Sequence, residues 1–342
     1  MRWIRDLTYS RVCGWLVHWP LLTLGVLVFR VTGKTPWLSY WAMRRLYCIT
    51  RGRSNRLLAR WLAKPASGGV DSSGFLGHMA LTDFRSSAIA LERDGFVLLG
   101  PLLSAAECDE LTTFALATPG TLIPAPISGP ALAQFDPAAP KAVKYDLPEW
   151  RLVRHPIVQR LLDDPSLRHL ARCYLGCEPV NDLIAMWWSA PASGPASSDA
   201  AQLYHFDMDR PQFLKIFFYL TEVTSDTGPH CYIRASHRDR PAALWRDGRH
   251  DDGAILSQHG PARAVEICGS RGMAMAVDTS GFHKGKPLKT GHRLILQLEY
   301  TCALFGSTFH NLRVPPSDFW RKQVSMSPSY YTRFTVTEDA GR

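Results

Sequence analysis

The chain has 342 residues, 46% of them hydrophobic, and a formal net charge of +9. A chain of this length and composition can bury a large core, which favours one main domain with extensions over two equal domains. Its eight cysteines show neither the paired spacing of a metal site nor a dense disulfide framework. Reduced thiols in a cytoplasmic setting are therefore expected.

The positive charge is concentrated at the N-terminus. Residues 1–64 contain twelve Lys or Arg residues and one acid, Asp6, whereas the remainder contains 27 basic and 29 acidic residues. The part beyond residue 64 is thus nearly neutral, and the overall charge says nothing about what it binds. The N-terminal basic residues alternate with long aliphatic runs and do not form a recognisable nucleic-acid-binding motif, so nucleic acid is not an expected partner.

The same N-terminal segment is also apolar. Val12 to Phe29 is eighteen residues without a formal charge, a marginal length for a transmembrane helix. Pro20 and the bases on both sides disfavour a simple span, and no small-residue cleavage site follows that would indicate a secretory signal. The stretch from Ser54 to Lys64 predicts a basic amphipathic helix with Ser54 as its cap. Two interpretations stay open: a peripheral anchor on the cytoplasmic face of a membrane, and a helical extension packed against the main domain.

Composition divides the chain into four parts: an N-terminal helical extension (1–65), a linker rich in Gly and Ser (66–85), the main domain (86–310) and a C-terminal tail (311–342). The stretch from Pro119 to Pro140 is too rich in Pro and Gly for a regular element, and we expect either a lid or a plain surface loop there.

The pattern His-x-Asp occurs three times, at His205/Asp207, His237/Asp239 and His250/Asp252. The second and third copies lie in polar stretches rich in turn residues, which predicts solvated loops. The first copy is preceded by the strand-like run from Asn181 to Ser189 and followed by the aromatic-rich run from Phe213 to Leu220. Residues two apart on an extended backbone point to one face, so His205 and Asp207 can converge on one metal ion.

A third ligand is predicted at His283. An apolar strand from Gly272 to Val277 turns out into His283, and a hairpin-like link over 285–291 leads into a strand that opens with Arg293. On adjacent antiparallel strands His283 and Arg293 would be close neighbours. Two imidazoles and one carboxylate form the facial triad of non-heme Fe(II) oxygenases, and a guanidinium can clamp a carboxylate through two parallel hydrogen bonds. The sequence therefore predicts iron on His205, Asp207 and His283, with Arg293 beside it.

Two further residues are expected near Arg293, where a ligand carboxylate would bind. Lys215 is the one charge in the run from Phe213 to Leu220, and a buried ammonium needs a partner. It either assists the cosubstrate carboxylate or pairs with Glu299 or Asp226. Gln297 shares a strand face with Arg293 and is predicted to line the same pocket.

From about residue 86 to 305 the chain resembles the phytanoyl-CoA dioxygenase family. Three stretches carry the resemblance: the run from Leu91 to Leu111, the helix end from Leu175 to Pro179, and the segment from Gly228 to His237. In the last segment, Arg234 and Ala235 stand where Pro and Gly are usual in the family. That difference affects a turn and touches no expected ligand.

The resemblance implies a mainly β fold with flanking helices, in which a double-stranded β-helix (jelly-roll, cupin-like) core follows the helical N-terminal extension. It implies Fe(II), 2-oxoglutarate and O2, with ascorbate as the reductant in an assay. Iron would be held by His205, Asp207 and His283, 2-oxoglutarate would chelate it, and Arg293 would pair with the far carboxylate. Hydroxylation of a small-molecule, lipid or acyl-type substrate, with release of succinate and CO2, is the expected reaction.

Two other classes of function stay open. A zinc-dependent hydrolase could use the same His/Asp/His residues, although no general base is evident beside the metal and Arg293 would have no role. A non-catalytic or membrane-associated jelly-roll binding protein would tolerate the loss of the triad, which this chain retains. The substrate and the oligomeric state are not predicted.

Overall fold

The structure is a computed structural model that describes residues 7–66, 73–77 and 79–338. Its strands are β1 (Phe96–Pro101), β2 (Gly120–Ile123), β3 (Leu132–Ala133), β4 (Lys144–Asp146), β5 (Val180–Ser189), β6 (Phe213–Tyr219), β7 (His230–Ile233), β8 (Ala264–Ile267), β9 (Met273–Val277), β10 (His283–Gly285), β11 (Arg293–Thr301), β12 (Leu312–Val314) and β13 (Phe334–Val336).

The helices fall into an N-terminal group and a group that flanks the sheets. The first group is α2 (Arg11–Cys13), η1 (Gly14–His18), α3 (Trp19–Thr32), α4 (Trp37–Thr50) and α5 (Arg53–Leu62). The second is α6 (Leu81–Asp94), α7 (Ala105–Ala117), α8 (Glu149–Leu152), α9 (Pro156–Asp163), α10 (Pro165–Leu175), α11 (Asp252–His259) and α12 (Asp318–Met326), with short turns η2 (Ala242–Leu244) and η3 (Pro261–Arg263).

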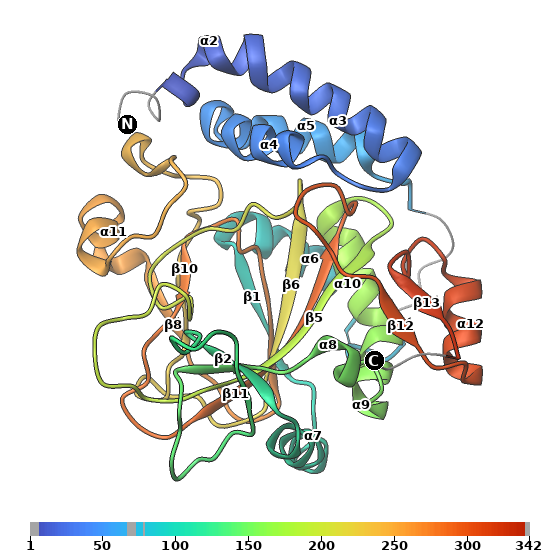
Figure 1. Ribbon diagram of the computed structural model, residues 1–342, viewed down its shortest axis with the longest axis vertical. Coiled ribbons are helices and arrows are strands. Elements are labelled where there is room, and N and C mark those ends of the chain that lie inside the picture. The colour runs from blue at the N-terminus through green and yellow to red at the C-terminus, as the bar shows by residue number, and fades with distance from the viewer. Residues whose placement is uncertain (1–6, 67–72, 78, 339–342) are drawn as a thin grey trace.

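Two antiparallel sheets face each other in the described part of the chain (Figure 1). The larger has eight strands in the order β1-β9-β6-β11-β5-β4-β2-β3, and the smaller has the order β10-β7-β8. Antiparallel order and helices on the outside confirm the mainly β, jelly-roll fold with a helical N-terminal extension.

The centre of the large sheet is formed by β5, β6 and β11, which correspond to three of the strand runs expected from the sequence. Every residue of β6 and β11 is buried, as expected for aromatic and branched runs between two layers. Ile295 lies opposite Tyr219 on one side and Trp187 on the other. This register places the alternate residues Arg293, Ile295, Gln297 and Glu299 on one face together with Lys215 and Phe217.

The link over 285–291 was expected to form a hairpin between the His283 and Arg293 segments, and this expectation is wrong. β10, which begins at His283, pairs with β7 in the small sheet, whereas β11 lies in the large one. Turn residues signal that the chain reverses direction, but they do not say which sheet receives the next strand. The two segments are nevertheless close: a Cβ on Gly285 would lie 3.3 Å from Nη2 of Arg293.

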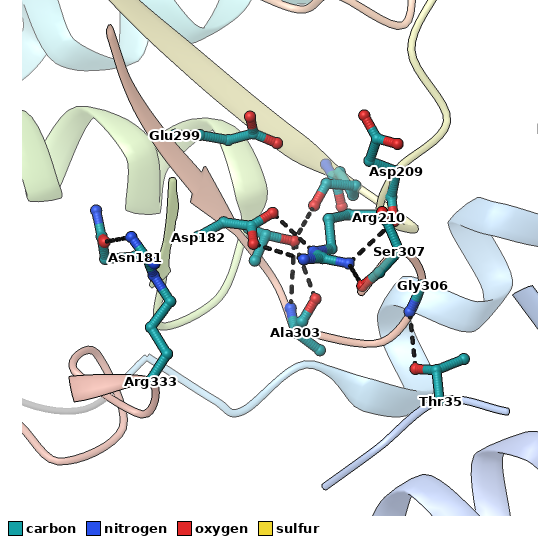
Figure 2. A network of polar contacts seen from close by, with 12 residues as sticks. Thr35, Asn181, Asp182, Asp209, Arg210, Glu299, Ala303, Gly306, Ser307 and Arg333 are labelled. Atoms are coloured by element: carbon teal, nitrogen blue, oxygen red, sulfur yellow. Dashed lines mark hydrogen bonds and ion pairs between the residues drawn. The ribbon is translucent and has the colours of Figure 1, made fainter. Parts of the chain in front are cut away.

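Helices α2 to α5, with η1, form a layer across one end of the sandwich, and we call them the N-terminal layer (Figure 1). The backbones of α3 and α4 touch, because a Cβ on Gly25 would lie 2.2 Å from Cβ of Ser39. The layer is joined to the domain by an edge-on contact between Phe29 and Phe305, with ring centroids 5.4 Å apart, and by the 2.9 Å hydrogen bond from the Gly306 amide to Thr35 Oγ1 (Figure 2).

The predicted helix from Ser54 to Lys64 corresponds to α5, but the predicted cap is wrong. The N-cap is Gly52 at φ 76°, and the Ser54 hydroxyl instead accepts a hydrogen bond from Thr50 Oγ1. Arg51 and Gly52 both adopt left-handed conformations, so α4 reverses tightly into α5. This turn brings Arg51 and Arg53 to one corner of the N-terminal layer.

Two segments differ from their description in the sequence analysis. The Pro- and Gly-rich stretch was expected to be irregular, but Gly120–Ile123 and Leu132–Ala133 pair as β2 and β3 at the sheet edge. Residues 311–338 of the expected tail contain β12, α12 and β13, with Trp320 fully buried. Within the expected linker, residues 67–72 and 78 lie outside the described residues, and α6 begins at Leu81.

Candidate active site

The structure brings His205, Asp207 and His283 together between the two sheets. One ligand atom from each lies within 4.8 Å of the others, the arrangement of a group that could hold a metal ion. Nε2 of His205 is 3.7 Å from Asp207 Oδ1, and Nε2 of His283 is 3.5 Å from Asp207 Oδ2. The backbones of the two histidines exchange both hydrogen bonds of an antiparallel bridge, at 3.0 and 2.9 Å, so their positions are fixed relative to each other.

Both imidazoles are oriented through their second nitrogen atom. Nδ1 of His205 lies 2.9 Å from the Leu203 carbonyl, and Nδ1 of His283 lies 3.0 Å from the Gly281 carbonyl. A carbonyl can only accept, so Nδ1 carries the proton and each Nε2 has a free lone pair. Burial lowers the pKa of both imidazoles, which favours this neutral form.

Asp207 is held in its ionised form by its neighbours. Burial alone would raise the pKa of this carboxyl, but the Lys215 ammonium holds it well below its usual range. Nζ of Lys215 donates to Asp207 Oδ2 at 2.7 Å. Burial would likewise lower the pKa of Lys215, yet Asp207 and Glu299 raise it above its ordinary value, so the ammonium persists in the interior.

Lys215 therefore contacts one of its expected partners and one that was not foreseen. It lies 3.5 Å from Glu299, whereas the pairing with Asp226 is wrong, since Asp226 binds Lys289 at 2.9 Å. Gln297 is buried, and its Nε2 lies 3.4 Å from Oε2 of Glu299. Lys215 and Gln297 were each expected near Arg293, and both have Glu299 as a neighbour.

Arg293 is buried without an acidic partner among the described residues. It is 5% exposed, its Nη2 donates to Ser189 Oγ at 3.2 Å, and its Nε and Nη1 have no hydrogen-bond partner. Burial lowers the pKa of this guanidinium. A buried cation left unpaired is costly, so a ligand anion would relieve this position.

Arg293 lies close to the strand that carries His283. A Cβ on Gly285 would lie 3.3 Å from Nη2 of Arg293. Gly285 and His283 are two residues apart on β10 and share one face of it, so Arg293 and His283 approach the same side of this strand.

Sequence reasoning missed His230, which lies at the same site. Its ring stacks on that of His283, with centroids 5.4 Å apart, and its buried Nε2 has no partner. Burial and Arg293 lower its pKa to about 3, so the ring is neutral. The available signal was a histidine inside the apolar strand β7, where a polar residue is uncommon.

A second buried arginine, Arg210, lies at the end nearest the N-terminal layer and is fully paired. Its Nε and Nη2 each donate to Asp182 at 2.7 Å, and its Nη1 donates to the Ser307 carbonyl at 2.5 Å (Figure 2). Figure 2 also shows Glu299 and Asp209 beside this pair. Protein groups therefore already satisfy the Arg210 guanidinium.

The other two His-x-Asp copies are apart from the triad. His237 lies 3.0 Å from the Glu92 carbonyl, and Asp239 binds Arg263 at 2.7 Å. Asp252 binds Lys284 at 2.5 Å. Among the described residues, the one histidine, cysteine and carboxylate group with metal-binding spacing is that of His205, Asp207 and His283.

The family model of phytanoyl-CoA dioxygenase matches residues 91–294. The chain belongs to the phytanoyl-CoA dioxygenase family. The expected family is thereby confirmed, and the match includes His205, Asp207, His283 and Arg293 but excludes the N-terminal layer. No curated protein matches the chain.

Several solved structures are similar to this family member. The non-heme alpha ketoglutarate dependent epimerase SnoN from nogalamycin biosynthesis is 18% identical over 65% of this chain and 84% of its own, with a TM-score of 0.47. EctD from S. alaskensis with bound Fe is 19% identical over 70% and 83%, with a TM-score of 0.44. The carbocyclase SnoK from nogalamycin biosynthesis is 15% identical over 68% and 87%, with a TM-score of 0.45.

Proposed function

We propose that this family member is an Fe(II)- and 2-oxoglutarate-dependent dioxygenase that hydroxylates a small-molecule, lipid or acyl-type substrate. One observation carries the proposal: a two-histidine, one-carboxylate cluster lies near a buried arginine that has no acidic partner. The donor set of two nitrogens and one oxygen is that of non-heme Fe(II) oxygenases, and the free guanidinium atoms suit a carboxylate.

His205, Asp207 and His283 would hold the iron. The fit is supported by the two Nδ1 contacts to backbone carbonyls, since a metal-binding histidine commonly uses its other nitrogen in this way. Lys215 would act as a positioning residue, because its 2.7 Å hydrogen bond fixes Asp207 Oδ2 and keeps the carboxylate ionised.

Arg293 would bind the far carboxylate of 2-oxoglutarate through Nε and Nη1, and Ser189 would hold its remaining nitrogen in place. Gln297 and His230 would line the same interior. When bound, iron with 2-oxoglutarate supplies the oxidising chemistry in which one oxygen atom of O2 enters the substrate and the other enters succinate, with loss of CO2. The surrounding aromatic and aliphatic residues, including Phe217, Tyr219 and Ile295, exclude water from that centre.

The proposed setting is the cytoplasm. All eight cysteines are free thiols in the structure, and a reducing compartment keeps both thiols and Fe(II) in their reduced forms.

The test is succinate formation by the full chain supplied with Fe(II), ascorbate, 2-oxoglutarate and O2, with and without lipid extract. We expect succinate even without substrate, at a low uncoupled rate, and a substrate product heavier by one oxygen atom. Asp207→Ala should reduce succinate formation about 1000-fold or more while far-ultraviolet circular dichroism is unchanged. Wild-type protein that binds Fe(II) and 2-oxoglutarate but never forms succinate would reject the proposal.

The same experiment separates the two other classes. A zinc-dependent hydrolase would act with Zn(II) in the absence of 2-oxoglutarate and O2, and a binding protein would hold ligand without consuming 2-oxoglutarate. Arg313→Gln is a matched control, because Arg313 is an exposed arginine on β12.

A further inference from the structure

A cavity of about 560 Å³ extends from Asp207 to the N-terminal layer. Asp207 lines it on one side, and Tyr47, Arg51, Arg53 and Arg56 line it on the other. The N-terminal layer thus supplies part of the lining of a cavity that opens onto Asp207.

Arginines from three separate segments line this cavity: Arg51, Arg53 and Arg56 at the α4–α5 corner, Arg210 on the loop after Asp207, and Arg238 and Arg240 between β7 and α11. Four carboxylates also line it: Glu92, Asp207, Asp239 and Asp278. Asp207 binds Lys215, Asp239 binds Arg263 and Arg210 is already paired with Asp182, which leaves five arginines against two carboxylates. Among the described residues, the three corner arginines form no ion pair. The cavity therefore carries an excess of positive charge.

Among the described residues, Arg240 is the most buried of the cavity arginines that have no acidic partner. It is 5% exposed, and its Nη2 donates to the Ser280 carbonyl at 2.6 Å. Its Nε and Nη1 have no hydrogen-bond partner. The guanidinium lies 3.8 Å from the ring centroid of Phe206 and 4.5 Å from that of Trp245. Aromatic rings cover the face of the guanidinium, and its Nε and Nη1 groups are buried without an acceptor among the described residues.

We propose that this cavity binds the phosphate ester of the substrate, with Arg240 as the inner ligand and Arg51, Arg53 and Arg56 as the outer cationic wall. The proposal rests on the proposed function, because it names the class of substrate that reaches Asp207. Guanidinium groups donate to phosphate in a planar fork, and several of them match its multiple charge better than a single carboxylate would.

Phosphate binding is tested on the full chain by calorimetry with inorganic phosphate and glycerol 3-phosphate, with sodium chloride at matched ionic strength as the reference. We expect both phosphate probes to bind, and Arg240→Met to weaken binding about 10-fold or more. If Arg240→Met fails to fold, the exposed double variant Arg53→Gln/Arg56→Gln decides, with a loss of about 3-fold expected. Arg313→Gln should bind as the wild type does.

Binding that chloride matches, or equal weakening by Arg313→Gln, would overturn the proposal. The measurement needs no turnover and no iron. Loss of the oxygenase activity would therefore leave phosphate binding readable, and the two failures can be told apart.

A different observation concerns the outer face of the N-terminal layer. The helical run Arg11–Thr32 has a mean hydropathy of 1.8 and is only 28% buried, and it is the one helix of the described residues long and apolar enough to cross a membrane. Leu22, Gly25 and Val26 pack inward. Trp15, Leu16 and Val31 are 72%, 73% and 86% exposed on the outside.

Charge and packing favour a bilayer surface as the occupant of this face. The described part of residues 1–64 contains ten Lys or Arg residues and no acid, which complements anionic lipid headgroups. The helix is fixed to α4 through Gly25 and to Phe305 through Phe29, so crossing a membrane would require breaking these contacts. We infer that the N-terminal layer lies in the headgroup region of an anionic membrane, with its apolar face inserted.

Co-sedimentation of the full chain with vesicles tests this surface. We expect binding to vesicles of phosphatidylcholine with phosphatidylglycerol, weaker binding to phosphatidylcholine alone, and a loss of about 10-fold in Trp15→Gln/Leu16→Gln. Ile127→Gln, at an exposed position of the β2–β3 hairpin, is the control and should bind normally. No vesicle binding, equal binding by the double variant, or a dimer that buries Trp15 without lipid would overturn the inference.

Vesicles also identify the source of the phosphate. If phosphatidylglycerol vesicles are oxidised and glycerol 3-phosphate is not, the substrate is a lipid held at the bilayer surface. Oxidation of the soluble ester alone would retain the phosphate proposal and show that the substrate is a soluble phosphate ester, while vesicle binding still decides the membrane inference.

Discussion

Two buried arginines in the interior of the domain have opposite surroundings. Arg210 is 3% exposed and makes two hydrogen bonds to Asp182, whereas Arg293 is 5% exposed and has two nitrogen atoms without a partner. Burial is therefore almost the same, and only the partners differ. A guanidinium that the fold already satisfies stabilises the fold, and one that the fold leaves open is available to a ligand.

Removal of the two guanidinium groups should affect stability very unequally. Arg210→Leu leaves Asp182 buried without its partner, and we expect the free energy of unfolding to fall by about 3–5 kcal/mol. Arg293→Leu removes an unpaired charge and should change it by less than about 1 kcal/mol. Urea unfolding measures both, and the double variant Asp182→Leu/Arg210→Leu should recover much of the loss. Equal destabilisation by the two single variants would break the comparison.

Arg293, rather than Arg210, should determine the affinity for 2-oxoglutarate. In Arg293→Leu we expect the concentration of 2-oxoglutarate for half-maximal succinate formation to rise about 100-fold, or about 2.7 kcal/mol, because a buried charge pair is lost. Arg293→Lys should restore part of the affinity as a point charge. A normal requirement for 2-oxoglutarate in Arg293→Leu would remove Arg293 from the site.

Stabilisation by bound 2-oxoglutarate should test the role of Arg293 without any turnover. At a concentration 100-fold above its dissociation constant, 2-oxoglutarate with the redox-inert Mn(II) should stabilise the wild type by about 2.7 kcal/mol. Thermal unfolding of Arg293→Leu should show little of this gain at the same concentration. Stabilisation of equal size in both proteins would mean that Arg293 does not contact the ligand.

Glu299, which lies beside the pair of Arg210 and Asp182, should make the free energy of unfolding depend on pH. Burial raises the pKa of Glu299 to about 8, from an ordinary value of 4.5. The folded protein then keeps a proton that the unfolded chain loses, so this contribution to stability is complete below pH 4.5 and is lost as pH rises to 8. Across that range the wild type should lose on the order of 1 kcal/mol more than Glu299→Gln in urea unfolding. Parallel pH profiles would show that Glu299 is already ionised.

The clustering of His205, Asp207 and His283 could be predicted from sequence because local signals indicate it. His205 and Asp207 are two residues apart, and His283 follows a recognisable strand and turn. The partners of Lys215 and Arg210 could not, because they depend on which strands become neighbours. Lys215 meets Asp207 across a loop and Glu299 through the register of β6 against β11. The same reason explains why the link after β10 was mistaken for a hairpin.

Arg240 and the α4–α5 corner were beyond sequence reasoning for a further reason. The arginines could be seen in the sequence, but the sequence does not distinguish a solvated arginine from one that lines a cavity. Ala235 is a partial exception. It stands where Gly is usual in the family and adopts φ 61°, so the departure from the family left the left-handed turn in place. The sequence therefore located the altered turn, and the structure showed that the backbone kept its shape.

The corner at Arg51–Arg56 lies before residue 91, where the family match begins. The reacting centre and a wall of the chamber around it are therefore supplied by different lengths of chain. A truncated protein that begins at α6 would retain the triad and lose Tyr47, Arg51, Arg53 and Arg56. Such a fragment would be an enzyme of altered selectivity rather than a smaller copy of the original. Substrate screens done on it would report the preferences of an open chamber.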